Sequence, residues 1–311
     1  MSIFSKVFLA GLSLLLLLPA TLQADLFVSA ASTNSVMRFD CNTGAFLGNF
    51  VAPGTGGLMD PQGIAFGPDG NLYVSSNGSN NVLRFNGQTG AFIDIFATVT
   101  GMNWPAEISF RNNHLYVSDF SFPGGRVSRF NATTGAFVDH FAINIALADG
   151  QEWDTNGDLL VSAFGTSSIR RYDGTNGSYL GDLVTPGTGG LNGPLDNLFL
   201  PNGNLLVSSF NTGSVKEYDA NGNFLGDAIA GLAGPQGLEI GPDGHLYAGD
   251  FTNGVINRYD INTFAFLGTF ATAPNAMTNN FVFRPVPEPG SGCLLACLLG
   301  SLVVRRRRNN R

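Results

Sequence analysis

The chain has 311 residues, a formal net charge of −7 and three cysteines, of which only Cys41 lies away from the apolar ends. Without those ends, ten basic and 22 acidic residues remain, so the central region carries a charge of about −12. This excess of acid argues against nucleic acid or an anionic membrane surface as a partner. A lone cysteine forms no internal disulfide, so packing must hold the region together.

The first 24 residues have the pattern of a secretory signal. Lys6 precedes an apolar stretch from Val7 to Leu18, and Pro19-Ala20 and Ala24 follow. A basic residue, an apolar core and small residues in this order are typical of a signal peptide that is removed on export. We therefore expect residues 1–24 to form a helical signal peptide outside the fold, with cleavage near Ala24.

Residues 25–285 contain one Leu-x-Val-Ser-like segment six times, at intervals of 41 to 46 residues. This is the spacing of four-stranded propeller blades. Each copy is followed by a segment that ends in an aromatic residue and, after a glycine-containing turn, by one that begins with an aromatic residue. The pattern indicates short strands and shows no helical period. The copies begin at Leu26, Leu72, Leu115, Leu159, Leu205 and Leu246.

The two ends of this region complete one repeat. The region begins with the second strand of a blade, at about 26–30, and ends with a first strand, at about 280–284. Pairing these two strands would close a ring and cover its exposed edges. The repeat resembles that of NHL-type six-bladed β-propellers. It predicts an all-β fold of six four-stranded blades, in which both sets of repeated aromatic residues pack one blade on the next.

The first strand of each blade lines the channel of a propeller, so its inward residues are candidates for a site. In the aligned copies, glycine alternates around the ring with an oxygen-bearing side chain. Three glycines would clear space for three oxygen ligands of a hard cation such as Ca²⁺, or for a polar substrate held through that metal. A polar, wet channel without a ligand is the alternative. The six positions are Gly63, Glu107, Gly150, Asp196, Gly237 and Asn280.

This ring resembles the regucalcin and gluconolactonase propellers, in which a Glu, an Asn and an Asp hold a catalytic divalent metal. The resemblance implies Glu107, Asp196 and Asn280 as metal ligands, and hydrolase or lactonase activity. Asn279 is an alternative to Asn280, since no second strand follows the closing strand in sequence to fix its register.

Loops on a rigid scaffold are the usual place for binding. Two near-identical loops, residues 51–58 and 184–191, lie three blades apart and are expected at the channel mouth. Trp104, Asp119 and Asp250 are expected on the same face, as candidate ligand contacts. The alternative is that the two loops are turn sequence left from blade duplication.

The end of the chain combines a short motif, an apolar run from Gly290 to Val304 and a cluster of arginines. This order resembles the PEP-CTERM sorting signal of Gram-negative bacteria, over residues 286–311, which an exosortase-type membrane enzyme processes. The run is expected to enter the membrane as a helix, with the arginines on the cytoplasmic side. At 15 residues it suits a temporary anchor. The motif residues are Pro287, Glu288, Pro289, Arg305, Arg306, Arg307 and Arg308.

These resemblances imply an exported, non-enzymatic propeller at the cell surface, the outer membrane or the extracellular matrix, binding glycan or protein through its loop-rich face. No histidine cluster, nucleophile elbow or cysteine pair in the sequence indicates zinc or acyl chemistry. The alternative function is the metal-dependent hydrolase or lactonase, and the cofactor then expected is Ca²⁺ or another divalent cation.

Overall fold

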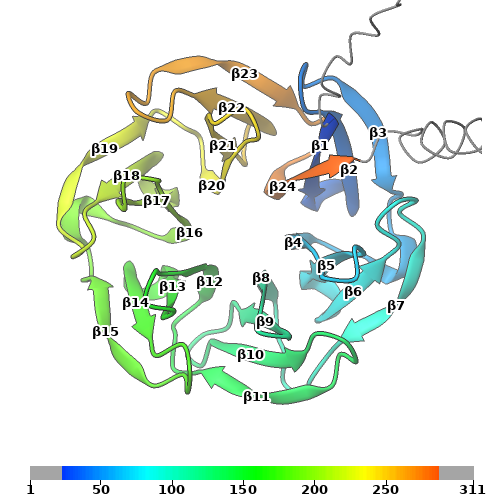
Figure 1. Cartoon of the computed structure of the whole chain (residues 1–311), viewed down its shortest axis with the longest axis horizontal. Coiled ribbons are helices and arrows are strands. Elements are labelled where there is room, and N and C mark those ends of the chain that lie inside the picture. The colour runs from blue at the N-terminus through cyan, green and yellow to red at the C-terminus, as the bar shows by residue number, and fades with distance from the viewer. Residues whose placement is uncertain (1–22, 287–311) are drawn as a thin grey trace, which may run out of the picture. The chain divides into compact units, whose positions relative to one another are not determined.

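Six antiparallel sheets of four strands each stand around a central axis (Figure 1). The computed structural model describes residues 23–286, of which Ala24–Pro285 form one compact unit. The predicted all-β, six-bladed propeller is therefore confirmed. Of the predicted signal peptide, residues 1–22 lie outside the described residues, whereas Gln23 and Ala24 belong to β1. Of the predicted sorting signal, residues 287–311 lie outside them, whereas Val286 ends β24. Within residues 23–286, no helix has the length and apolar character needed to cross a membrane.

Blade 1 contains β24 and β1–β3, and blades 2 to 6 follow in chain order. The innermost strands are β4 (Pro61–Phe66), β8 (Pro105–Arg111), β12 (Ala148–Trp153), β16 (Pro194–Phe199), β20 (Pro235–Ile240) and β24 (Thr278–Val286). The second strands are β1 (Gln23–Ala30), β5 (Leu72–Ser76), β9 (His114–Asp119), β13 (Leu159–Ala163), β17 (Leu205–Ser209) and β21 (Leu246–Asp250).

The third strands are β2 (Ser35–Asp40), β6 (Asn81–Phe85), β10 (Arg126–Asn131), β14 (Ser168–Tyr172), β18 (Ser214–Tyr218) and β22 (Val255–Tyr259). The outermost strands are β3 (Phe46–Val51), β7 (Phe92–Ala97), β11 (Phe137–Ala142), β15 (Tyr179–Val184), β19 (Phe224–Ala230) and β23 (Phe266–Thr272). Short 3₁₀ turns occur at η1 (Ala31–Thr33), η2 (Thr55–Gly57), η3 (Asn77–Ser79), η4 (Phe164–Thr166), η5 (Thr188–Gly190) and η6 (Phe210–Thr212).

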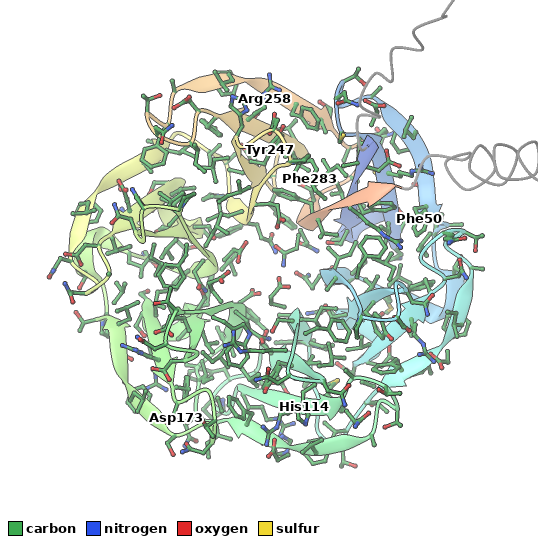
Figure 2. The ribbon with its side chains drawn as sticks, viewed as in Figure 1. Phe50, His114, Asp173, Tyr247, Arg258 and Phe283 are labelled. Atoms are coloured by element: carbon green, nitrogen blue, oxygen red, sulfur yellow. The ribbon has the colours of Figure 1, made fainter. Side chains whose placement is uncertain are left out.

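The ring closes as predicted, because β24 pairs with β1 (Figure 1). The backbone N–H of Asn280 donates to Ser29 Oγ at 3.0 Å. Figure 2 shows Tyr247 of the sixth blade beside Phe283 of the closing strand, with ring centroids 4.8 Å apart. Similar edge-to-face contacts between successive blades join Phe27 to Phe66, Tyr73 to Phe110 and Tyr116 to Trp153.

The prediction that both repeated aromatic sets are core was right for the third strands and wrong for the outermost strands. The aromatic residues of the outermost strands are 38% to 60% exposed. Each covers the buried aromatic ring of the third strand in its own blade, with ring centroids 5.5 to 5.9 Å apart. Radial blades diverge with distance from the axis, so no facing sheet covers the rim. The buried residues are Phe39, Phe85, Phe130, Tyr172, Tyr218 and Tyr259. The exposed residues are Phe46, Phe92, Phe137, Tyr179, Phe224 and Phe266.

The serine of the repeated motif joins neighbouring blades. Ser75 Oγ accepts a hydrogen bond from the backbone N–H of Gly63 in its own blade at 2.8 Å. The same hydroxyl donates to the backbone carbonyl of Ala106 in the next blade at 2.5 Å. Corresponding donations run from Ser29 to the Gln62 carbonyl (2.6 Å) and from Ser118 to the Asp149 carbonyl (2.7 Å).

We expect Ser75→Ala to lower the free energy of unfolding by about 1–3 kcal/mol, because it leaves a buried N–H and a buried carbonyl without their partner. Urea unfolding of the two proteins measures the difference. Ser178→Ala, at an exposed turn, is the matched control and should change stability by less than about 0.5 kcal/mol. Equal effects of the two substitutions would contradict this role for Ser75.

Candidate functional site

A bulge in the innermost strands turns two successive residues toward the axis. In blade 2, for example, the pairing of β4 with β5 shifts register between Pro61 and Ile64, and blades 3 to 6 show the same shift. Such bulges re-aim side chains. The first bulge residue and its counterpart in β24 line a hollow of about 340 Å³, which we call the mouth hollow. These residues are Gln62, Ala106, Asp149, Leu195, Gln236 and Asn279.

The second bulge residues form the alternating ring that the sequence indicated. Glu107, Asp196 and Asn280 all line a deeper hollow of about 190 Å³, which we call the inner hollow. The structure thus brings the three predicted polar residues together and places Asn280, not Asn279, in their layer. Asn279 instead lines the mouth hollow.

The glycines of this ring have a packing role. A Cβ on Gly63 would lie 2.5 Å from the Ala106 carbonyl oxygen, and one on Gly150 would lie 2.4 Å from the Leu195 carbonyl oxygen. These glycines therefore let the next innermost strand approach closely. They also leave room for the oxygens of the ring, since a Cβ on Gly237 would lie 3.0 Å from Asn280 Oδ1 and one on Gly150 would lie 3.1 Å from Asp196 Oδ1.

The carboxylates of this ring are engaged by protein donors. Glu107 Oε1 accepts from the Ile108 N–H at 2.9 Å, and its Oε2 accepts from Asn280 Nδ2. Asp196 accepts from the N–H groups of Asn197 (2.8 Å) and Leu238 (2.7 Å). Among residues 23–286, no group of three His, Cys, Asp or Glu side chains is arranged to hold a metal ion. Glu107 and Asp196 would have to release these donors before they could hold, with Asn280, the divalent metal implied by the regucalcin-like resemblance.

Five carboxyl groups line the two hollows, and none forms an ion pair within the described chain. Burial raises the pKa of Glu152 and of Asp196 to about 7. Burial, and then the charges of Asp196 and Glu152, raise the pKa of Glu239 to about 8. Burial and the nearby charge of Asp196 also raise the pKa values of Glu107 and Asp149. The channel is thus an acidic space without a basic counterpart.

Five aromatic side chains surround the mouth hollow, and we call them the aromatic collar: Trp104, Phe120, Phe164, Phe210 and Phe251. The four phenylalanines directly follow the second strands of blades 3 to 6. Ring centroids are 5.5 Å apart for Phe120 and Phe164, and 6.2 Å apart for Phe210 and Phe251. Trp104 is 49% exposed. Aromatic faces therefore meet solvent along most of the mouth.

Backbone hydrogen bonds and small residues hold the collar in place. The N–H of Phe120 donates to the Trp104 carbonyl at 3.0 Å, and the N–H of Phe210 donates to that of Gly193 at 3.0 Å. Gly193 has a φ of +65°, and a Cβ there would lie 2.7 Å from the Phe164 ring. Trp104 has a φ of +54°, a left-handed conformation that is uncommon for a bulky residue.

Amide side chains line the rest of the mouth hollow. Gln62, Asn77 and Asn279 come from blades 1 and 2, where the position of the collar phenylalanines is not aromatic. Gln236 Nε2 donates to Gln62 Oε1 at 3.3 Å, joining blades 6 and 2. The mouth hollow therefore combines flat apolar faces with polar groups that both donate and accept hydrogen bonds.

The structure places Asp119 and Asp250 behind the mouth, where they anchor loops. Each is 3% exposed, and neither lines the mouth hollow or the inner hollow of the described domain. Asp119 accepts from the Asn103 N–H at 3.3 Å, and Asp250 accepts from the Ala233 N–H at 3.0 Å. In other blades a serine at this position binds the same loop, as Ser76 does. Of the predicted mouth residues, only Trp104 faces the hollow.

The two near-identical loops lie against the outer rim. A Cβ on Gly56 would lie 2.2 Å from the ring of Phe92 in β7, and one on Gly189 would lie 2.3 Å from the ring of Phe224 in β19. The expectation that these loops form the channel mouth was therefore wrong. Their glycines are explained by close packing on an outermost strand of the next blade.

Comparison with known proteins identifies the fold. No family model matches the sequence, and no curated protein matches it. Among solved structures, one from a nidogen/laminin complex has a TM-score of 0.64 and 16% identity over 84% of this chain and 98% of that chain. A protein of unknown function from Bacteroides caccae has a TM-score of 0.64 and 15% identity over 85% and 100%.

A catalytically inactive virginiamycin B lyase from Staphylococcus aureus, solved with quinupristin, has a TM-score of 0.54 and 16% identity over 71% of this chain and 73% of that chain. All three likenesses are propeller likenesses at low identity. They indicate a shared fold and not a shared chemistry, because one fold carries many functions.

We expect the folded domain to lose stability as the pH rises from 5 to 8. Glu152, Asp196 and Glu239 have folded-state pKa values of about 7, 7 and 8, above their ordinary values of 4.5, 3.8 and 4.5. The folded state therefore binds more protons in this range, and its advantage is lost as these carboxyls ionise. Unfolding at pH 5 and 8 should differ by roughly 2 kcal/mol or more, and Glu239→Gln should reduce the difference. A free energy of unfolding that increases from pH 5 to pH 8 would contradict this prediction.

Proposed function

We propose that this protein is a non-enzymatic binding module that holds a glycan or a protein at the mouth of its channel. One observation carries the proposal. Five aromatic side chains that would be expected in the core instead surround a hollow open to solvent. Exposed apolar patches rimmed by polar groups are typical of binding sites. The rigid ring behind the collar keeps these side chains in place before a ligand arrives.

The hydrolase alternative receives less support from the geometry. Glu107 and Asp196 each use their oxygens to bind backbone or amide donors, as described above. The histidines also lie away from the channel lining of the described domain: His114 begins β9, His140 lies in β11 and His245 precedes β21. Asp149 is the one ionisable side chain among the described residues that line the mouth hollow, so no acid–base pair is identified there.

We further propose that the module is exported and carried at the surface of a Gram-negative cell or in its matrix. This rests on the sequence at the two ends: the signal-like residues 1–24 and the motif, apolar run and arginine cluster of residues 286–311. An exosortase-type enzyme is the proposed processing partner, and the apolar run is the proposed membrane contact before processing.

Removal of one collar ring should weaken binding. We expect the full chain to bind members of a glycan and peptide array, and Phe164→Ala to weaken that binding about fivefold or more, the usual effect of losing an aromatic anchor. Phe137→Ala is the matched control, since Phe137 is 42% exposed on an outermost strand far from the axis. Binding that Phe137→Ala weakens as much as Phe164→Ala would move the site away from the mouth.

Processing at both ends should be visible in a Gram-negative host that contains an exosortase. We expect the cell-surface fraction to hold a protein that lacks residues 1–24 and is shortened near Pro287-Glu288-Pro289, as measured by mass spectrometry. A chain ending at residue 285 should be exported and not retained. Recovery of the full chain from the cytoplasm with both ends intact would contradict the proposed location.

A further inference from the structure

Three buried asparagines along the channel present oxygens that lack a hydrogen-bond donor within residues 23–286: Asn197, Asn279 and Asn280. Each is 8% exposed or less and lines the mouth or inner hollow. Asn279 Nδ2 donates to the Pro61 carbonyl at 2.5 Å, and Asn197 Nδ2 donates to the Gly150 carbonyl at 3.2 Å. Because a backbone carbonyl only accepts hydrogen bonds, the atom that faces it must be Nδ2, and the positions of Oδ1 and Nδ2 in these two side chains are fixed. The channel therefore offers acceptors in need of a donor.

The charged groups of the channel lack a counterpart in the same way. Within the described chain, the carboxylates of Asp149 and Glu239 take part in no ion pair or hydrogen bond, although both line the hollows. A buried carboxylate without a partner is unfavourable. Asp149 lies in the mouth hollow itself, and Glu239 lies deeper, in the inner hollow. A cation bound in the mouth hollow would compensate Asp149.

The basic residues of the domain are elsewhere. Of the ten within residues 23–286, eight belong to the third strands, where many pair with acids of the outermost strands, as Arg84 does with Asp94 at 2.6 Å. The other two, Arg111 and Arg284, lie near the ends of β8 and β24 and stack on the rings of Trp153 and Phe66. No described lysine or arginine lines either hollow. The described basic residues thus lie outside the channel, and the acids inside it have no basic partner among them.

The aromatic collar adds the third element. The faces of aromatic rings attract cations, and the attraction is strongest where water is displaced. The collar phenylalanines and Trp104 line the same hollow as Asp149 and Asn279. Aromatic faces, a carboxylate and an unpaired amide oxygen together suit a positively charged donor. A neutral sugar would leave the carboxylate uncompensated.

We propose that the mouth hollow binds a primary ammonium group on an unbranched alkyl chain, with the methylenes inside the aromatic collar and the ammonium directed at Asp149 and Asn279 Oδ1. The proposal rests on the binding function of the mouth given above and names the chemistry of its ligand. A primary ammonium carries three donors and no acceptor, which matches the groups present. A quaternary ammonium has no donor for the amide oxygen. The chemistry is shared by a lysine side chain of a partner protein and by a free polyamine.

Calorimetry of the full chain with 1,5-diaminopentane tests this directly. 1,5-Pentanediol is the matched neutral ligand, with the same chain length and no charge, and we expect it to bind at least tenfold more weakly. The two sources are distinguished by comparing spermidine with a short lysine-containing peptide. Tighter binding of the peptide identifies a protein partner, and tighter binding of spermidine identifies a polyamine.

Substitution then locates the site. We expect Asp149→Asn to weaken binding of the diamine tenfold or more, and Asp94→Asn, on an outermost strand, to leave it unchanged. Asp149→Asn should fold at least as well as the natural protein, because it replaces a buried carboxyl that has no side-chain partner with a neutral group of the same shape, and a thermal melt checks this. Trp104→Phe should weaken diamine binding and remove the fluorescence change on binding, since Trp153 is the only other tryptophan.

The proposal is overturned if no ammonium compound binds, if the diol binds as well as the diamine, or if Asp149→Asn has no effect. These failures differ from a failure of the proposed function. A neutral glycan that binds at the collar, and is lost in Phe164→Ala, would overturn the ammonium ligand while the binding module stands. Loss of every collar-dependent ligand would overturn both.

Discussion

A serine hydroxyl that bonds two blades at once is the interaction on which the channel depends. At the first three blade junctions, the serine of the repeated motif donates to the backbone carbonyl of the first bulge residue in the next blade: Gln62, Ala106 or Asp149. In blade 2 the serine also accepts from the N–H of the second bulge residue of its own blade, and in blade 1 from that of its counterpart Asn280. A bulged strand leaves such groups without ladder partners. The hydroxyl supplies them, and so holds both layers of channel side chains in register.

The sequence predicted the architecture well because the same four-stranded blade, with the same sequence pattern, occurs six times. The regular Leu-x-Val-Ser spacing identified the blades, and the half-repeats at the two ends identified the closure. The alternation of glycine located the second bulge residues, although close packing of neighbouring strands is a reason for these glycines that the sequence did not reveal. The exposure of the outermost aromatic residues could not be predicted in this way, because a repeat does not reveal how far blades diverge. Asp119 and Asp250 looked like ligand contacts because an acid in a loop has the same sequence signal whether it binds a ligand or a backbone.

The four phenylalanines of the collar were missed although their signal was present. Phe120, Phe164, Phe210 and Phe251 each stand two residues after the last residue of the Leu-x-Val-Ser-like motif. Extending the repeat by those two positions would have found four aromatic residues in successive blades. Their exposure, however, depends on facing a hollow, which only the ring provides. Likewise, the described basic residues avoid the channel because eight of the ten lie in third strands. This can be seen only when the distance of each strand from the central axis is known.

Closure by β24 gives the fold a fixed order of completion. The hydrogen bond between Ser29 and Asn280 joins residues 251 positions apart, so it is among the most non-local contacts in the chain, and such contacts form slowly. Blades 2 to 6 are each built from one continuous stretch and have no such requirement. Because synthesis runs from the N-terminus, β24 is the last strand to emerge, and the first blade can be completed only then. A nascent chain would therefore carry an open edge on β1 until its final strand arrives, and that edge is where a chaperone or a second unfinished copy would meet it.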